Sequence, residues 1–229
     1  MKLAIMQPYF LPYIGYFQLI NAVDKFVIYD DVNYIKQGWI NRNRILLNGK
    51  DHLFTISLLG ASSFKKINEI IIKNNFDKTI KTIEQGYKKA PYFDRFFPMI
   101  IGIFRFETLN LSEFVYNSIK EIANYLDIKT DFVISSKLEK DDSLRGQDKV
   151  IHICKLFYSN VYINSIGGQN LYSRDFFRNN GIELKFLKTN SISYQQFNNT
   201  FIPNLSIIDM LMFNSKERVV QLLEEFTLL

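Results

Sequence analysis

The stretch KLAIMQPYFLPYIGYFQLINAVDKFVIYDD, residues 2–31, decides the fold. Its apolar run over 2–6 is typical of a buried parallel strand, and the prolines that follow are incompatible with a helix. Helical spacing then predicts a helix over 15–22, and a second apolar run predicts a strand over 26–29. Strand, loop, helix and strand within about 30 residues make a βαβ unit. The sequence therefore predicts an α/β fold with a mainly parallel sheet.

Polar residues stand at the carboxyl ends of both predicted strands. Gln7 and Tyr9 follow the first strand, and Asp30 and Asp31 close the second. Ligands of open parallel sheets bind beyond the carboxyl ends of the strands, so we expect a site there. Either aspartate is a candidate catalytic base, because a shift of register by one residue exchanges the faces to which they point. Three residues at the expected helix start are further candidates for substrate binding: Tyr13, Gly15 and Tyr16.

The segment after the second strand carries another group of candidates. In an extended backbone, Asn41 and Asn43 share one face, and Arg42 and Arg44 share the other. A guanidinium pair suits the binding of phosphate or carboxylate, and an asparagine pair beside Trp39 suits a planar ligand or a sugar. The alternative is a basic edge strand without a ligand. We favour a functional role because the segment directly follows the aspartates.

The rest of the chain is expected to complete the same sheet. Asn48-Gly49, between runs over 45–47 and 52–58, predicts a β-hairpin. Helical patterns over about 73–128 predict a helical insertion within a single domain of residues 1–229, with helices on both faces of a Rossmann-like sheet. Further strands are predicted over 67–72, 131–136, 161–163 and 183–187, and further helices over 77–89, 92–106, 111–126 (with Ser112 as its N-cap), 149–158, 173–179, 205–211 and 217–226.

A strand followed by a glycine turn and a helix recurs later in the chain. The strand runs towards Ser165, and Gly167 and Gly168 then lead to Tyr172 and a predicted helix. Glycines at such a place allow backbone amides to approach an anionic group at a helix start. The turn is not a Walker loop, because no Gly-Lys-Ser/Thr follows. Arg145, in an earlier polar loop, is a further candidate ligand for phosphate.

Composition and charge narrow the functional class. The 229 residues carry a net charge of +5 without a long basic run or a nucleic-acid-binding motif, so nucleic acid is not an expected partner. A mild positive balance favours an anionic substrate. The sequence has no apolar run of about 18 residues and no signal-peptide pattern, and its single cysteine fits a reducing compartment. We therefore expect a cytoplasmic protein without a membrane span.

The cysteine and the histidines do not form a recognisable reactive group. Cys154 has mostly apolar neighbours at one helical turn, which raises the pKa of a thiol and makes it inert. His152 is two residues away, so the two side chains do not face each other on a helix. The two histidines and the cysteine also lack the spacing of a zinc site. We expect a core cysteine and no metal.

Several of these motifs together resemble the WbqC-like family. The motifs are Gln7-Pro8-Tyr9-Phe10-Leu11-Pro12, Gly15-Tyr16-Phe17, Asp30-Asp31-Val32, the run from Trp39 to Ile45, Ser165-Ile166-Gly167-Gly168, Tyr172, Asn180-Gly181-Ile182 and the run from Leu205 to Asp209. They cover nearly the whole chain. The family is found among genes for bacterial surface polysaccharides such as O-antigen. The resemblance implies transfer of glycine or another acyl group to an amino sugar.

The resulting hypothesis is a cytoplasmic acyl or aminoacyl transferase that acts on the amine of a nucleotide-linked amino sugar. This reaction needs a base, donors to a tetrahedral oxyanion and a grip on the diphosphate. The candidates are Asp30 or Asp31 for the base, Asn41 and Asn43 or the amides of Gly167 and Gly168 for the oxyanion, and Arg42, Arg44 and Arg145 for the phosphates.

A second resemblance concerns the fold alone. Nucleotidyltransferases with a His-x-Gly-His motif place it after the first strand, where this chain has Tyr13-Ile14-Gly15-Tyr16. A neutral phenol, with a reference pKa of about 10, does not supply the cationic contacts of those histidines. The similarity therefore implies a shared fold but not adenylyl transfer, unless Arg42 and Arg44 compensate.

Three alternatives stay open at this point. One is an ATP-dependent ligase or nucleotidyltransferase with the same site, and another is a non-catalytic protein that binds a sugar nucleotide. The third is a thioester on Cys154. The acyl donor is also open: a coenzyme A thioester, the thioester of a carrier protein as partner, or ATP.

Overall fold

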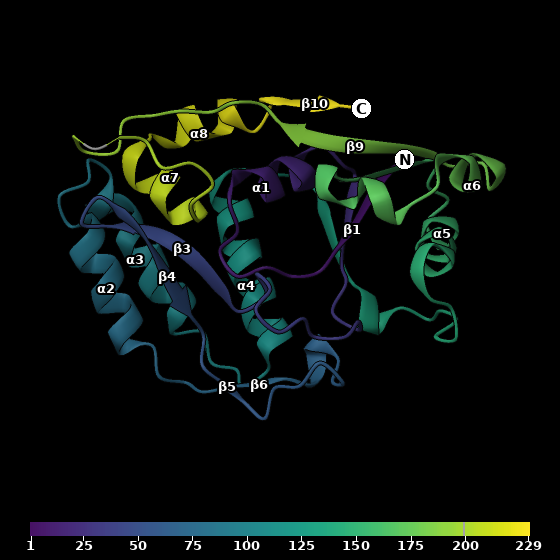
Figure 1. Ribbon diagram of the computed structural model, residues 1–229, viewed down its shortest axis with the longest axis horizontal. Coiled ribbons are helices and arrows are strands. Elements are labelled where there is room, and N and C mark those ends of the chain that lie inside the picture. Colours follow the sequence, from purple (N-terminus) through teal and green to yellow (C-terminus); the bar gives the residue numbers. More distant parts are fainter. Residues whose placement is uncertain (199) are drawn as a thin grey trace.

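A computed structural model describes residues 1–198 and 200–229 of the chain. It contains a six-stranded sheet in the order β10-β9-β8-β1-β2-β7, of which β1, β9 and β10 are labelled in Figure 1. β10 runs antiparallel to β9, and the other neighbours are parallel, which confirms the predicted mainly parallel sheet. The strands are β1 (Lys2–Met6), β2 (Lys25–Ile28), β7 (Asp131–Ile134), β8 (Val161–Ser165), β9 (Glu183–Thr189) and β10 (Phe226–Leu228).

Helices cover both faces of the sheet, because its central strands are apolar at successive positions that point to opposite sides. Leu3 and Ile5 of β1 pack against α5 and α6. Ala4 of β1 and Phe26 of β2 pack against α1 and α4 on the other face. The prediction of helices on both faces is confirmed. These helices are α1 (Ile14–Asn21), α4 (Leu111–Tyr125), α5 (Gly146–Leu156) and α6 (Arg174–Asn179).

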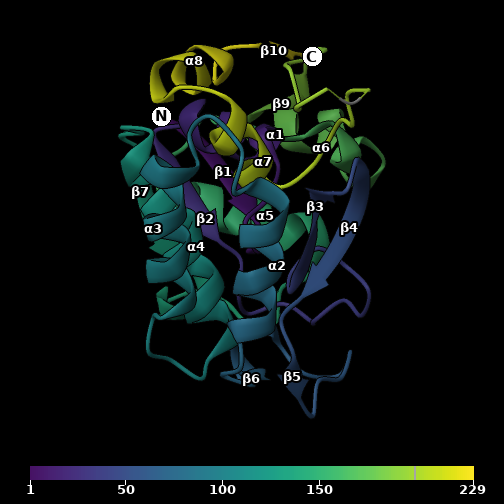
Figure 2. The same ribbon diagram turned by 90° about the vertical axis from the view of Figure 1, so that its left-hand side faces the viewer.

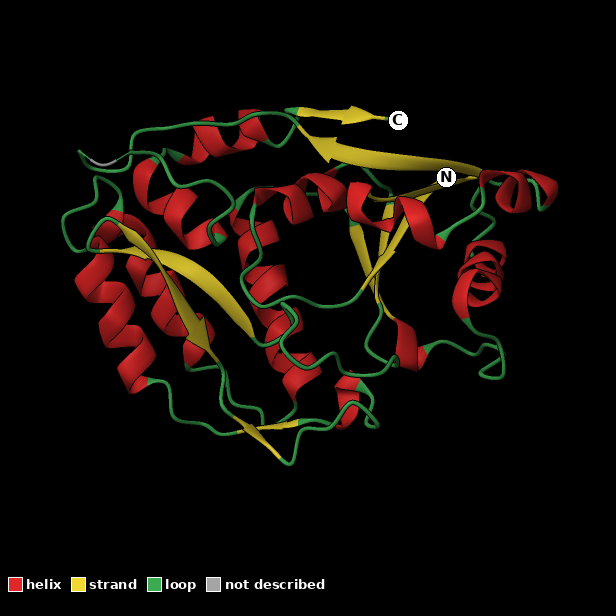
Figure 3. Cartoon of the chain, in the orientation of Figure 1, coloured by secondary structure: helices red, strands yellow, loops and turns green. Residues whose placement is uncertain are grey.

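The predicted hairpin is present and forms a separate two-stranded sheet, which stands apart from the main sheet in Figure 3. Its strands meet at the Asn48-Gly49 turn, where both residues have positive φ. Helix α2 lies alongside it (Figure 2), and the Tyr87 hydroxyl accepts a hydrogen bond from the Leu46 amide. The remaining elements are β3 (Arg42–Leu47), β4 (Lys50–Thr55), β5 (Leu58–Leu59), β6 (Ile71–Ile72), α2 (Asp77–Tyr87), α3 (Phe93–Phe104), α7 (Ile207–Phe213), α8 (Lys216–Leu222) and the 3₁₀ helices η1 (Ile67–Glu69), η2 (Ser135–Lys137) and η3 (Ile166–Leu171).

Three sequence-based boundaries were wrong. The strand predicted over 67–72 is present only at its end, as β6 (Ile71–Ile72), because residues 67–69 form the 3₁₀ helix η1, whose first amide donates to the Val32 carbonyl. The helix predicted over 217–226 ends early, because residues from Phe226 onward pair with β9 as a further strand. The N-cap of α4 is Asn110, whose side chain accepts from the Glu113 amide at 3.1 Å, and not Ser112, which is buried in the first turn.

The loop between β1 and α1 is fixed by side chains from distant parts of the chain. Asn43 Nδ2 donates to the carbonyls of Phe10 at 3.1 Å and Leu11 at 2.8 Å. Ser206 Oγ also donates to the Leu11 carbonyl, at 2.7 Å. The Tyr16 hydroxyl donates to the Gln7 carbonyl at 2.9 Å. These bonds satisfy backbone carbonyls that no regular element would satisfy, so the loop has one defined shape.

Replacing Asn43 by alanine should destabilise the fold. Asn43→Ala leaves buried carbonyls without their donor, and we expect the free energy of unfolding to fall by about 2 kcal/mol. Urea denaturation measures this change. Asn21→Ala is the matched control, because Asn21 makes a single exposed hydrogen bond, to Glu224. Equal losses in the two variants would contradict the anchoring role.

Candidate functional site

The carboxyl ends of the parallel strands meet at one edge of the sheet, and the chain changes direction there at β1. From β1 it builds β2 and β7 on one side, and later β8 and β9 on the other. Ligands of open α/β sheets bind at such a switch point. Two hollows border this edge. We call them the lysine recess and the aromatic trough.

The lysine recess, of about 280 Å³, lies beyond the end of β2. At its base is the buried carboxylate of Asp31, whose Oδ2 accepts a hydrogen bond from Lys149 Nζ at 2.9 Å and lies 3.1 Å from Lys140 Nζ. Only 6% of the Lys149 side chain and 2% of the Lys140 side chain are exposed. The lining residues are Tyr29, Asp31, Val32, Asn33, Lys66, Asp142, Arg145, Gly146 and Lys149.

Positive charge exceeds negative charge in this recess. Two ammonium groups share the Asp31 carboxylate, and Asp142 Oδ1 lies 3.7 Å from each of them. The Asp142 side chain is 68% exposed, so water screens its negative charge and it balances the two ammonium groups only partly. Lys66 and Arg145 add two cations at the rim. The arrangement suits an anionic group such as a phosphate.

The protonation states follow from burial and from these neighbours. Burial alone would raise the pKa of the Asp31 carboxyl, but interactions with Ser135, Lys149 and Lys140 outweigh it and lower the pKa to about 2. Ser135 Oγ makes no hydrogen bond of normal geometry within the described residues, so we give the lysines the greater weight. Burial, followed by the charge of Asp31, raises the pKa of Tyr29, whose phenol therefore stays a neutral donor.

The two adjacent aspartates separate, as the sequence predicted for neighbours in an extended backbone. Asp30 is turned towards η2, where its carboxylate accepts from the Ser136 amide at 2.9 Å and from the Ser136 hydroxyl at 2.6 Å. Asp31 is ion-paired in the lysine recess. A carboxylate held by two cations is a weak base, so these contacts favour structural or positioning roles for both residues.

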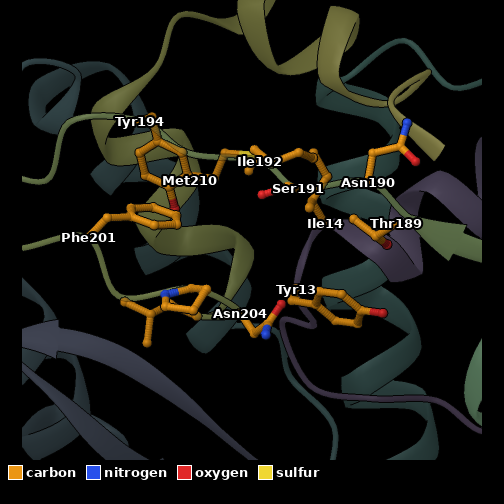
Figure 4. Close-up of a pocket in the computed structure, with 12 residues that line it drawn as sticks. Tyr13, Ile14, Thr189, Asn190, Ser191, Ile192, Tyr194, Phe201, Asn204 and Met210 are labelled. Carbon is orange, nitrogen blue, oxygen red and sulfur yellow. The ribbon is translucent and has the colours of Figure 1, made fainter.

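The aromatic trough has two adjoining parts, of about 240 and 300 Å³, whose linings share Tyr13 and Asn204. The Tyr13 ring lies directly over Gly15. A Cβ atom at Gly15 would be 2.4 Å from the Tyr13 hydroxyl and 2.5 Å from Thr189 Oγ1, so only glycine fits beneath that ring. In Figure 4, which shows the first part of the trough, Tyr13 and Thr189 lie at one end, and the aromatic rings of Tyr194 and Phe201 lie at the other.

A buried carboxylate fixes the far end of this trough. Asp209 Oδ2 accepts hydrogen bonds from the Tyr194 hydroxyl at 2.7 Å and from Gln196 Nε2 at 2.6 Å. Its Oδ1 accepts from the Tyr87 hydroxyl at 2.9 Å. Burial raises the pKa of Asp209, although these three donors oppose the rise. The network joins α2, α7 and the loop before α7, and it sets the position of the Tyr194 ring.

The second part of the trough is lined by Tyr9, Trp39 and Arg44, which the sequence singled out. The Trp39 ring lies 5.8 Å from the guanidinium of Arg42 and 5.6 Å from that of Arg44. Arg42 donates to backbone carbonyls of its own loop, whereas Arg44 lines the hollow and reaches Asp51 at 3.2 Å. Tyr9 also lines it, and its ring packs 5.6 Å from that of Tyr16. Arg42 and Arg44 therefore do not act as a free pair.

The asparagines lie on the face opposite the arginines, as predicted. Asn41 Oδ1 accepts from the Tyr34 hydroxyl at 2.8 Å, and its Nδ2 donates to the Ile56 carbonyl at 2.9 Å. Asn43 binds the loop after β1 and also lines the trough. Both side-chain amide groups already donate to backbone carbonyls, so their positions do not favour donation to an oxyanion.

The glycine turn after β8 differs from the expected helix start. Ser165 precedes the 3₁₀ helix η3, and Gly168 packs so closely that a Cβ would lie 2.7 Å from Asn164 Nδ2. Gly167 is exposed. The Tyr172 ring packs 5.7 Å from that of Phe177 in the core. Gly167 and Gly168 are not among the residues that line either hollow.

Arg145 lines the lysine recess as expected of a phosphate ligand, although its guanidinium now bonds carbonyls of its own loop. Sequence reasoning missed Lys140 and Lys149. A signal existed for Lys149, since it shares the apolar face of its helix with Val150 and Ile153, where a lysine requires a partner. Lys140 carried no such signal, because it lies outside regular structure.

Cys154 is a core residue, as the sequence predicted. It is fully buried, and burial raises the pKa of its thiol to about 12. At such a pKa almost no thiolate exists at neutral pH, which opposes a role as nucleophile. Within the described residues, no group of three or more His, Cys, Asp or Glu side chains is placed to hold a metal ion, and no helix is long and apolar enough to cross a membrane.

Comparison with known proteins places this arrangement in a family. The WbqC-like protein family matches residues 7–221, which include both hollows. The chain belongs to the WbqC-like family. A relative from Mycobacterium tuberculosis strain H37Rv, the uncharacterized protein Rv1507c, is 28% identical over 215 residues, which cover 92% of each chain. No solved structure matches the chain.

The ion pairs of Asp31 should make stability depend on pH in acid. Because the folded-state pKa is lowered from 3.8 to about 2, ionised Asp31 stabilises the fold above the higher value, and this stabilisation is lost as the pH falls towards the lower one. Asp31→Asn should lower the free energy of unfolding at neutral pH by about 3 kcal/mol. Urea unfolding over a pH series should show the variant and the wild type converging in acid.

The control is Asp131→Asn, whose partner Lys25 binds it at the surface, with 76% of the Asp131 side chain exposed. It should change stability little at any pH. A difference between Asp31→Asn and wild type that stays constant through the acid range would contradict the ion-pair assignment.

Proposed function

We propose that this WbqC-like protein transfers an acyl or aminoacyl group to the amine of a nucleotide-linked amino sugar in the synthesis of a bacterial surface polysaccharide. The observation that carries the proposal is the buried pair Lys140 and Lys149 on the single carboxylate of Asp31. Lys149 lines the lysine recess beyond the end of β2, and Lys140 adds a second, buried ammonium group on the same carboxylate. A diphosphate would bind there without any rearrangement of long, flexible side chains.

The aromatic trough supports a sugar or acyl group as the other part of the ligand. Tyr9, Tyr13 and Trp39 offer amphipathic rings, and Asn204 offers an amide. Pockets for small molecules combine apolar surface with a few polar groups in this manner. Tyr13 and Tyr16 offer no positive charge, so the contacts favour acyl transfer over adenylyl transfer.

The proton acceptor in this proposal is Asp142. Asp30 is bonded to Ser136, and the two lysines contact Asp31 at 2.9 and 3.1 Å. Asp142 lies farther from the same ammonium groups, at 3.7 Å, and it lines the recess with 68% of its side chain exposed, so water screens those cations at its carboxylate. In a 2-amino sugar the amine is adjacent to the carbon that bears the diphosphate, so a carboxylate at the mouth of the phosphate site can reach it. The amine nitrogen attacks the acyl carbonyl of a thioester, and its proton passes to the carboxylate. The C–S bond then breaks, the sulfur leaves as a thiolate, and the carboxylic acid returns the proton to it to give the free thiol.

Binding is tested first, by thermal shift with uridine- and thymidine-linked amino sugars, ATP and coenzyme A thioesters. We expect a shift with an amino-sugar nucleotide, and Lys149→Met should weaken its binding at least about tenfold because one charge-assisted contact is lost. The control is Lys155→Met, an exposed lysine of the same helix that binds Asn180. A shift with ATP alone, together with pyrophosphate release, would instead indicate a ligase.

Turnover is tested by mass spectrometry of the acylated sugar. Asp142→Asn should reduce kcat about 100-fold or more with little change in sugar-nucleotide affinity, as for loss of a general base. Asp141→Asn, next in sequence and bonded to Ser143, is the matched control. Unchanged kcat in Asp142→Asn would remove Asp142 from the mechanism, and absence of product with every donor would support a binding protein.

A further inference from the structure

One end of the molecule exposes several large apolar side chains. Single exposed apolar residues need no explanation, whereas a group of them marks an interaction surface. We call this group the apolar rim. It consists of Phe64, which is 93% exposed, Leu109 at 60%, Ile35 at 52%, and Leu59 and Ile71 at 46% each.

Backbone pairing holds the apolar rim together. Leu59 and Ile71 are register partners in the β5–β6 sheet, and the next amide, of Ile72, donates to the Leu109 carbonyl at 2.9 Å. The residues next to Ile35 and Phe64 are also joined, since the Tyr34 amide donates to the Lys65 carbonyl at 2.9 Å. β5 and β6 lie at the lower edge of the molecule in Figures 1 and 2.

The helix η1 connects these two parts of the rim. Its Ile67 amide donates to the Val32 carbonyl at 3.0 Å, close to Ile35 in the chain. Its Asn68 carbonyl accepts from Asn110 Nδ2 at 2.7 Å, next to Leu109. Backbone hydrogen bonds therefore join the segments that carry the apolar side chains of the rim.

Positive charge is concentrated on the side of the rim that holds Ile35 and Phe64. Lys36, Lys65, Lys66 and Lys73 are exposed, and the segments 32–40 and 58–66 contain no aspartate or glutamate. The carboxylate of Glu69, the next acidic residue after these segments, caps the Lys66 amide at 2.8 Å. Exposed Glu69 lies near Ile71 in the chain, and exposed Glu107 and Glu113 lie near Leu109, so the lysines stand without acids only beside Ile35 and Phe64. Exposed apolar side chains beside these lysines match an anionic surface with an apolar layer beneath it.

We infer that the apolar rim binds the surface of an anionic membrane, with Phe64 inserted below the headgroups and the flanking lysines at the lipid phosphates. The shape favours a bilayer over a folded protein partner, because Phe64 projects from a loop tip into solvent. Lys66 and Asn33 also line the lysine recess, so the bound protein would present that recess next to the membrane. The inference does not rest on the proposed function.

Vesicle sedimentation tests this binding without any substrate. The wild-type chain should sediment with phosphatidylcholine vesicles that contain about 30% phosphatidylglycerol, less with phosphatidylcholine alone, and less at high salt. Phe64→Ser combined with Leu109→Ser should lower the bound fraction at anionic vesicles roughly fivefold or more. Lys65→Glu with Lys66→Glu should abolish the preference for the anionic lipid. Tyr158→Ser is the control, because Tyr158 is 92% exposed but follows α5, outside the rim.

A second measurement places the Phe64 side chain in the bilayer. Trp39 is the only tryptophan, so Phe64→Trp in a Trp39→Phe background gives a single reporter at the loop tip. Its fluorescence should shift to the blue and be quenched by brominated acyl chains. The inference is overturned if wild type ignores anionic vesicles, if the Phe64→Ser, Leu109→Ser variant binds them as well as wild type, or if the rim substitutions instead dissociate a dimer or the complex with an acidic carrier protein.

Discussion

One buried carboxylate determines how the functional edge of this protein is built. Asp31 follows β2, Lys140 lies after η2, and Lys149 lies in the first turn of α5. The shared oxygen of Asp31, with Asp142 Oδ1 3.7 Å from each ammonium group, allows the two cations to be buried close together. The three segments are consequently tied to one another at the carboxyl ends of the strands. The recess keeps its shape and its positive charge without a ligand, which is the form of preorganisation that anion recognition requires.

Much of the fold was predictable because short-range patterns decided it. The apolar runs of β1 and β2, the prolines between them and the Asn48-Gly49 turn each act within a few residues. The failures have the opposite cause. Phe226 becomes part of a strand because Thr189, far away in sequence, offers an unpaired edge, and Ile67 begins a 3₁₀ helix because its amide is taken by Val32. Local propensity contains no information about such partners.

The position of the site was predictable from local sequence patterns, but the partners of its side chains were not, because those partners are distant in the chain. The expected edge holds both hollows, and the alternation of Asn43 with Arg42 and Arg44 was read correctly from spacing alone. The roles of Asp30 and Asp31 depend on Ser136 and Lys149, which are more than 100 residues away. Sequence alone therefore indicated where carboxylates gather but not which cations or hydroxyls would hold them.

The position of β1 has a consequence for synthesis on the ribosome. β1 is central, yet one of its two neighbours, β8, begins at Val161, and the carbonyl of Leu11 waits for the hydroxyl of Ser206. β2 and Asn43 follow soon after the first strand and its loop, but β8 and Ser206 leave the ribosome long after them. At typical translation rates that interval lasts about ten seconds or more, and during it β1 lacks its pairing with β8 and the loop lacks its hydrogen bond from Ser206. The amino-terminal motif is thus among the earliest parts of the protein to be made and among the last to reach its final structure.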